Sequence, residues 1–316
     1  MACAVKSMDM VNAKELLRSL PGILDKDLDA ADWQRTSSAN AIRCTVAGKK
    51  PFIKSGESIE ANFYRHVAPR FPAELLPECL HIVDDSLVLE DLSDTHQLGS
   101  PPGIPFPPDR YQRYLEAQAR LHALTALWPD RAELMAQVGE PFVRVSNLRA
   151  GYQEVLPLVL EGYGDCLARV ERDQLEAIAA AEFEPHFFGP ECIFNGHAHF
   201  ANVMFSESDL RLIDWNQVQV GMGEVAVAYS LGASVGQAYR DENEMRLLQA
   251  YARALNEHGL ELEFDVVFER YRWCLLLNVF KLTCRSRWVG DFALWFQTLV
   301  QCLACIRSHG AMELLR

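Results

Sequence analysis

The sequence lacks long apolar runs. No window approaches the roughly 18 to 20 uninterrupted apolar residues that a membrane-spanning helix needs. The first residues also lack the apolar core of a secretory signal peptide, because Lys6 and Asp9 lie among short apolar pieces. We therefore expect no membrane association and predict a cytoplasmic protein.

An excess of positive charge is also missing. The chain has 30 Lys and Arg residues against 43 Asp and Glu residues, which gives a formal net charge of −13 at pH 7. Nucleic acids and anionic membrane surfaces are bound by clustered Lys and Arg, so this balance argues against both as partners. A local cationic pocket remains compatible with it.

The cysteines lack the spacing of a disulfide framework. There are nine of them, an odd number, scattered through segments with strand and helix patterns. Reduced, buried thiols are the better interpretation. Cys302 and Cys305 form one Cys-x-x-Cys, but it stands alone inside a helical pattern. Helix packing is therefore favoured over a metal or redox role for this pair.

Internal repeats and low-complexity segments are absent as well. With 49% hydrophobic and 23% charged residues, the 316-residue chain has the composition of a folded globular protein. This excludes a disordered or fibrous class. The length suffices for a two-lobed enzyme or two small domains.

Residues 192–205 and 210–215 carry the most informative pattern. An apolar run enters a loop rich in Asn and His, a second apolar run leaves it, and a hairpin then delivers Asp214. In kinase-type sites a loop Asp accepts the hydroxyl proton, an Asn five residues later holds a metal ion, and an Asp after the next hairpin holds Mg²⁺. Asn202 and Asp214 fill the two metal positions, and His197 stands five residues before Asn202.

The order of these residues resembles the aminoglycoside and choline kinase-like phosphotransferases, which share the protein-kinase fold. Members usually read His-Gly-Asp-x-His-x-x-Asn, followed by Ile-Asp-Trp or Ile-Asp-Phe. Residues 195–202 read Asn-Gly-His-Ala-His-Phe-Ala-Asn, and residues 213–215 read Ile-Asp-Trp. The frame matches, whereas Asn195 and His197 depart from it.

The resemblance implies an α+β, two-lobed protein-kinase-like fold. Residues 1–92 would form a nucleotide-binding lobe with a small antiparallel sheet, which ends at the hinge. Residues 93–316 would form a larger, mostly helical lobe with the catalytic loop and the substrate region. We predict strands at 41–46, 51–54, 80–83 and 86–89. Predicted helices cover 9–20, 57–68, 109–127, 131–137, 148–160, 166–182, 242–258, 264–287 and 291–309.

The resemblance also implies ATP or GTP as the nucleotide, bound with Mg²⁺ between the lobes. Asn202 and Asp214 would hold the metal ion, and Lys54, paired with Glu60, would contact the phosphates. As an exposed pair, Lys54 and Glu60 would contribute only about 0 to 1 kcal/mol to stability. The remaining nucleotide-binding candidates are the phosphate-loop residues Ser37 and Ser38, where glycine is missing, and the hinge residues Glu90, Asp91 and Leu92.

Activity depends on His197, because it occupies the position of the usual catalytic Asp. A neutral imidazole can accept a proton near pH 7, so His197, Asn202 and Asp214 are the predicted catalytic residues. The predicted reaction is phosphoryl transfer to a small hydroxylated or amino-group-bearing molecule. The alternative is a pseudokinase that binds nucleotide, a small molecule or a partner. A transition-metal site at His197 and His199 is the least favoured option.

Two further positions bear on the resemblance. His122 lies in Arg-Leu-His-Ala on the predicted helix 109–127, where a hydrogen-bonded structural role is favoured over catalysis. Ala226 stands where the family usually has an Asp shortly before an Ala-Tyr pair. The acceptor substrate and the oligomeric state are not indicated by any residue pattern.

Overall fold

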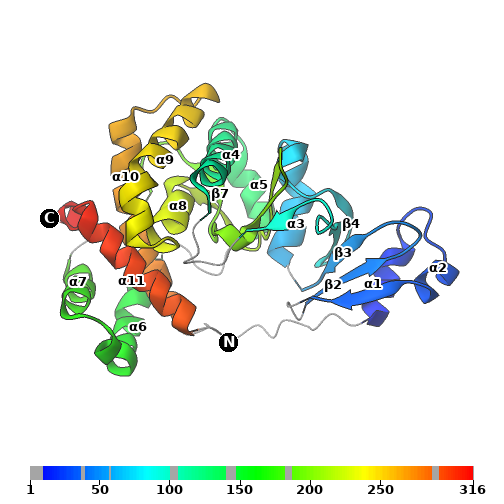
Figure 1. The fold of residues 1–316 in the computed structure, drawn as a ribbon, viewed down its shortest axis with the longest axis horizontal. Coiled ribbons are helices and arrows are strands. Elements are labelled where there is room, and N and C mark those ends of the chain that lie inside the picture. Colours follow the sequence, from blue (N-terminus) through cyan, green and yellow to red (C-terminus); the bar gives the residue numbers. More distant parts are fainter. Residues whose placement is uncertain are drawn as a thin grey trace. The chain divides into compact units, whose positions relative to one another are not determined.

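A computed structural model describes residues 10–36, 40–56, 58–99, 106–139, 147–181, 187–286 and 292–315 of the protein. The chain divides into two compact units (Figure 1). The first comprises residues 1–98, 132–141 and 202–218, and the second comprises 99–131, 142–201 and 219–316. Neither unit is continuous in sequence, and the linear boundary after residue 92 stays a prediction.

The first unit is built on a five-stranded antiparallel sheet with the strand order β1-β2-β3-β5-β4. Its strands are β1 (Asp32–Arg35), β2 (Ala41–Thr45), β3 (Pro51–Lys54), β4 (Cys79–Val83) and β5 (Ser86–Glu90). Ala47 and Asp84 both have φ of 49° in the turns after β2 and β4, a backbone conformation that lets these two hairpins close. The four strands predicted from the sequence are confirmed.

Helices α1 (Met10–Arg18) and α2 (Asp25–Asp29) pack on this sheet. Apolar residues of α1 recur at helical spacing, so they form one stripe that is buried against the apolar side chains of the strands. The resulting core contains Ala13, Leu16, Leu17, Leu20, Leu28, Ile42, Cys44, Ile53 and Val88. This core fixes the strand register and therefore the position of Lys54 at the end of β3.

The same unit contains α3 (Ser58–His66) and a three-stranded sheet of order β6-β8-β9. These strands are β6 (Gln97–Leu98), β8 (Val203–Phe205) and β9 (Leu210–Leu212). Phe63 of α3 stacks on Trp215, with ring centroids 4.4 Å apart and planes 7° apart, and Phe71 meets both rings edge-on. This aromatic cluster joins α3 to the segment that follows β9. All but the first residue of α5 (Arg131–Val138) also belong to this unit.

The second unit is mostly helical. Its helices are α4 (Pro108–Ala126), α6 (Leu148–Tyr163), α7 (Arg169–Ala180), α8 (Glu224–Val227), α9 (Gln237–Glu257), α10 (Phe264–Arg285) and α11 (Phe292–Ser308). α10 packs against α6, α9 and α11, and α4 packs against α9 and β7 (Cys192–Asn195). β7 pairs with β10 (Val218–Gly221), all but the first residue of which lies in this unit. β7 delivers the chain to the loop that carries His197.

The small sheet and the larger helical part confirm the predicted fold class. Two helix starts were wrong. The helix predicted from residue 166 begins at Arg169, because the Glu171 carboxylate accepts the N–H of Ala168 at 2.7 Å and caps the helix there. The helix predicted from residue 242 begins at Gln237, since the polar Arg240 faces inward and obscures the apolar period. Among the described residues, no helix has the length and apolar composition needed to cross a membrane.

Candidate functional site

Three charged side chains of the first unit meet at the end of β3. Lys54 Nζ lies 2.5 Å from Glu60 Oε2 and 2.6 Å from Asp214 Oδ1. The side chain of Lys54 is 11% exposed and that of Glu60 is 2% exposed, whereas the Asp214 side chain is 29% exposed. The predicted Lys54–Glu60 contact is therefore present. The expectation of an exposed, weak pair was wrong, because Glu60 lies on the buried face of α3.

Backbone and side chain together hold Glu60 in this cluster. Its second oxygen, Oε1, accepts the backbone N–H of Trp215 at 3.0 Å. Burial raises the pKa of the Glu60 carboxyl, the Lys54 ammonium lowers it, and the net direction is upward. Glu60 thus links Lys54 of β3 to the segment that follows β9.

Asp214 has an unusual backbone conformation. Its φ is 61°, in the left-handed region that non-glycine residues seldom adopt. The hydrogen bond from Trp215 N–H to Glu60 and the stacking of Trp215 on Phe63 fix the next residue. Residues held in this way are concentrated at functional sites and cost about 1 to 3 kcal/mol each. The contacts of Trp215 therefore help to hold Asp214 in this strained backbone conformation.

Asn202 lies beside this segment through the β8–β9 hairpin. The register pairs Val203 with Leu212, and the carbonyl oxygen of Asn202 accepts the N–H of Ile213 at 3.0 Å. Asn202 is 8% exposed. Amide and carboxylate oxygens are the donors that Mg²⁺ takes in proteins, so the donor chemistry of Asn202 and Asp214 fits this ion. The two predicted metal ligands thus come from adjacent positions at the end of one hairpin.

The loop that carries His197 follows β7 in the second unit. The side-chain Oδ1 of Asn195 accepts the His197 N–H at 2.9 Å, and His199 Nδ1 accepts the Ala201 N–H at 3.1 Å. His199 Nδ1 therefore carries no proton in this arrangement. The rings of His197 and His199 meet edge-on, with centroids 4.3 Å apart. Asn195, which departs from the family pattern, acts as the residue that turns the loop.

Lys281 of α10 supports this loop, and the sequence analysis missed it. Its buried ammonium donates to the carbonyl oxygen of Gly196 and lies 4.4 Å from the centroid of the Tyr229 ring. Burial, and to a lesser extent Arg285, lower the pKa of Lys281 to about 7. A single cation within the apolar stretch 274–284 was the signal that could have revealed it.

Burial also shifts the titration of His197. It lowers the pKa of the imidazole well below its ordinary value of 6.5, and His199, Arg285 and Lys281 lower it further. The ring is therefore neutral at physiological pH, as a proton acceptor must be. Among the described residues, neither His197 nor His199 lies in a group of three side chains able to share a metal ion.

The predicted hinge residues lie at and after the end of β5. The N–H of Glu90 donates to Glu78 at 2.9 Å, and the N–H of Asp91 donates to Lys50 at 2.9 Å. The Asp91 carboxylate pairs with Arg43 at 3.1 Å. An adenine ring at this strand end would therefore have to use other backbone groups. Leu92 is buried, as a hinge residue that packs beneath a ring would be.

Two other predictions concern residues around these segments. Ser37 and Ser38 lie outside the described residues. The flanking Asn40 is buried, and its side-chain amide donates to the Ser55 carbonyl oxygen at 3.1 Å. His122 makes the expected structural contact, with Nδ1 2.9 Å from the hydroxyl of Tyr251, and burial lowers its pKa to about 3.

Comparison with solved structures identifies the fold. The chain is similar to an aminoglycoside phosphotransferase candidate from Ralstonia eutropha jmp134, with a TM-score of 0.62 at 10% identity over 96% of this chain and 98% of the other. It is also similar to an ethanolamine kinase from Plasmodium vivax, with a TM-score of 0.56 at 12% identity over 97% and 98% of the two chains. A ternary complex of streptomycin, ATP and APH(2")-IIa matches with a TM-score of 0.53 at 13% identity over 95% and 97% of the two chains.

These similarities define the class by its fold. The chain has the kinase-like fold of small-molecule phosphotransferases, so the resemblance inferred from the catalytic-loop frame is confirmed at the level of the fold. No family model matches the sequence, and no curated protein matches it significantly. At 10–13% identity the match carries the architecture, while the chemistry depends on the residues described above.

Proposed function

We propose that this protein is an ATP-dependent phosphotransferase that modifies a small hydroxylated or amino-group-bearing molecule. The observation that carries the proposal is the position of Lys54, 2.5 Å from Glu60 and 2.6 Å from Asp214. Phosphoryl transfer needs a positioned lysine for the phosphates and a carboxylate for the metal ion. An ordinary surface lysine would not lie between two carboxylates, one of them buried.

Each residue of the first unit then has a role with nucleotide. Mg²⁺, when bound, would neutralise charge on the phosphates. Asn202 and Asp214 would hold that ion with an amide and a carboxylate oxygen. Lys54 would exchange its contact with Asp214 for a contact with a phosphate oxygen, while Glu60 would keep the Lys54 ammonium in place. The ATP complex of a protein with this fold supports adenine nucleotide as the donor.

His197 would orient the acceptor group and take its proton. Its lowered pKa keeps the imidazole neutral and ready to accept a hydrogen bond, but also makes it a weaker base than free imidazole. The transition state of phosphoryl transfer is loose, so a weak base lowers the rate less than it would in acyl transfer. We infer slow transfer, with orientation of the acceptor as the main contribution of His197.

The second candidate is a pseudokinase, and one observation favours it. The loop that follows β7 has no carboxylate at position 197, and the buried surroundings of His197 disfavour the imidazolium that would form on taking a proton. Nucleotide binding with no phosphate transfer to any acceptor would support this candidate. Lys54, Asn202 and Asp214 would then bind nucleotide without turnover.

The test is metal-dependent nucleotide binding, followed by turnover. A thermal-shift titration of the full chain with ATP or GTP should show stabilisation that needs Mg²⁺, since ligand at a hundred times its Kd adds about 2.7 kcal/mol. Asp214→Asn should abolish the Mg²⁺-dependent part. Asp94→Asn is the matched control, because this exposed carboxylate of the same unit pairs only with a surface lysine among the contacts described.

Turnover separates the two candidates. Transfer of labelled γ-phosphate to a panel of hydroxylated and amino acceptors should be detectable in the wild type and lost in Asp214→Asn. The absence of a Mg²⁺-dependent shift with either nucleotide would refute the proposal. A shift without transfer to any acceptor, in the wild type and in His197→Asp, would replace phosphotransferase with pseudokinase.

A further inference from the structure

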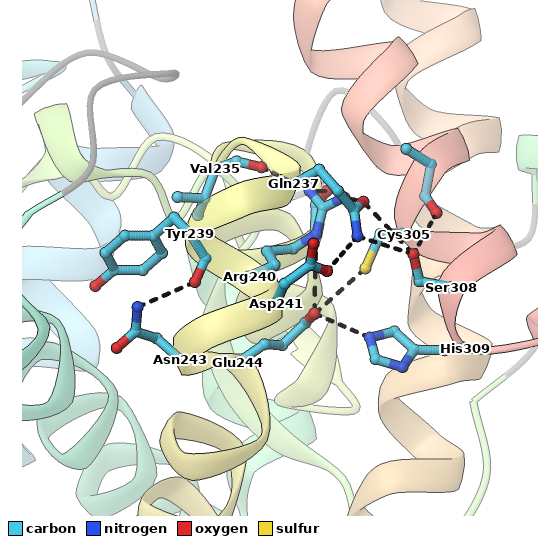
Figure 2. Close-up of polar contacts among 12 residues, drawn as sticks. Val235, Gln237, Tyr239, Arg240, Asp241, Asn243, Glu244, Cys305, Ser308 and His309 are labelled. Atoms are coloured by element: carbon cyan, nitrogen blue, oxygen red, sulfur yellow. Dashed lines mark hydrogen bonds and ion pairs between the residues drawn. The ribbon is translucent and has the colours of Figure 1, made fainter.

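A cluster of three potential metal ligands lies in the second unit, apart from any residue assigned above. Glu244 comes from α9, Cys305 from α11, and His309 directly follows α11 (Figure 2). Cys305 Sγ lies 3.3 Å from Glu244 Oε1, and His309 Nε2 lies 3.0 Å from Glu244 Oε2. One ligand atom from each residue falls within 4.8 Å of the others. Figure 2 shows Cys305 and His309 both directed at the Glu244 carboxylate.

These ligand atoms are removed from water. Cys305 is fully buried, Glu244 is 4% exposed, and the His309 side chain is 13% exposed. His309 Nε2 is buried and lies 3.0 Å from Glu244 Oε2, at ion-pair distance. When neutral, the imidazole offers the lone pair of this nitrogen to a metal ion in place of that contact.

We propose that Glu244, Cys305 and His309 bind one transition-metal ion of the Zn²⁺ class. A thiolate, an imidazole and a carboxylate are together the donors that Zn²⁺ takes, with three protein ligands leaving a fourth position for water. Around a tetrahedral Zn²⁺ at ordinary bond lengths, such donor atoms are separated by about 3.3 to 3.6 Å. The three ligand atoms now lie within 4.8 Å of one another, so the side chains would have to move closer together around the ion.

The chemistry of the cluster also sets the condition for binding. Burial, reinforced by Glu244, raises the pKa of the Cys305 thiol well above its ordinary value, so the thiol keeps its proton until a metal ion displaces it. Binding of the ion by the thiolate then releases this proton. The groups that act on the pKa of this thiol are Glu244 and Arg240 of α9, Tyr271 of α10, and Cys302, which lies on α11 with Cys305.

The neighbours of Glu244 decide how tightly the ion is held. Burial alone would raise the pKa of this carboxyl, but His309, the Tyr271 hydroxyl and Arg240 outweigh it and keep the carboxyl ionised. Arg240 Nε lies 3.8 Å from Glu244 Oε2, and its guanidinium is anchored at 2.6 Å to the Val235 carbonyl oxygen. This fixed positive charge opposes a bound dication, so we expect weaker binding than in a closed Cys₄ site. The ion would join α9 to the end of α11.

The experiment uses the full chain without a polyhistidine tag. Titration with Co²⁺ should give one equivalent per chain, a sulfur-to-cobalt charge-transfer band and the visible bands of a tetrahedral ion. Zn²⁺ should then displace the cobalt. Cys305→Ser should remove the charge-transfer band and weaken binding at least tenfold. Cys302→Ser is the matched control, because this thiol lies one turn earlier on α11 and donates instead to the Leu275 carbonyl oxygen at 3.4 Å.

A second variant protects the test against misfolding. His309→Gln changes a partly exposed side chain after the helix end, and it too should weaken Co²⁺ binding at least tenfold while the circular dichroism spectrum is unchanged. Asp214→Asn should keep the full cobalt spectrum, which separates this site from the proposed Mg²⁺ site. Folded wild type that binds neither Co²⁺ nor Zn²⁺ stoichiometrically, or Cys302→Ser and Cys305→Ser spectra that change equally, would overturn the proposal and leave a hydrogen-bonded cluster.

Discussion

Replacing Lys281 with methionine should change protein stability in opposite directions at low and high pH. The substitution keeps an unbranched chain of similar volume, and it removes the ammonium that donates to Gly196 and lies over the Tyr229 ring. The pKa of Lys281 falls from 10.5 in the unfolded chain to about 7 in the folded protein. Each unit of difference in pKa is worth about 1.4 kcal/mol. The free energy of unfolding of the wild type therefore falls by about 5 kcal/mol as the pH falls from 10.5 to 7.

The sign follows from the direction of the shift. Above pH 10.5 the amine is neutral in both states and makes no contribution through titration. As pH falls to about 7, the unfolded chain takes up a proton that the folded protein does not, and the unfolded state is favoured. Contact with Tyr229 favours the ammonium and reduces the effect by about 0.5 to 2 kcal/mol. Loss of the hydrogen bond to the buried Gly196 carbonyl costs the variant about 1 to 3 kcal/mol at every pH.

Lys281→Met should therefore be less stable than the wild type at pH 10 and at least as stable at pH 6.5. Urea unfolding of both proteins at pH 6.5, 8 and 10 measures the difference, and titrations common to both proteins cancel. Lys26→Met, on the exposed surface of α2, reports the effect of losing one solvated charge. A difference between wild type and Lys281→Met that is constant from pH 6.5 to 10 would refute the assignment of a depressed pKa.

Three other predictions test separate contacts. Lys54→Met should destabilise the protein by about 3 to 5 kcal/mol in urea unfolding, because it leaves the buried Glu60 carboxylate without its cation, and Lys54→Met combined with Glu60→Gln should recover part of this loss. If His197 is the base, kcat/KM should fall only below pH 6.5, as its lowered pKa requires, and an acid limb centred at or above 6.5 would contradict this. Gly223→Ala should lower stability by about 1 to 3 kcal/mol, since the added Cβ would lie 2.4 Å from His122 Nδ1, and an unchanged Tm would contradict that crowding.

Local chemistry in the sequence was sufficient to predict much of the first unit. Lys54 at the end of an apolar strand and Glu60 on the next helix stand six positions apart, and short-range geometry brings them together. The hairpin that presents Asp214 also followed from turn signals and alternating apolar residues. Burial of the Lys54–Glu60 pair could not be predicted, because α3 packs against Trp215, which is 155 positions from Glu60 in the sequence.

The helical unit was less predictable at the level of its side chains. Helical periodicity located α10, yet it could not reveal that Lys281 reaches the carbonyl oxygen of Gly196, 85 positions earlier. The cluster of Glu244, Cys305 and His309 could not be predicted for the same reason, since Glu244 of α9 and Cys305 of α11 are 61 positions apart. The isolated Cys-x-x-Cys drew attention to Cys302 and Cys305 as a pair, whereas the fold directs their thiols to different partners.

The first unit is interrupted twice by segments of the second, and this order has a consequence for synthesis on the ribosome. Lys54 and Asp214 are 160 positions apart. At roughly 5 to 20 residues per second, Lys54 and Glu60 leave the ribosome about 8 to 30 seconds before Asp214 and Trp215. During that interval Glu60 lacks the Trp215 amide, and the aromatic ring that covers Phe63 has not been made. A nascent chain that stalls before residue 214 therefore exposes this half-built apolar surface, where chaperones would bind.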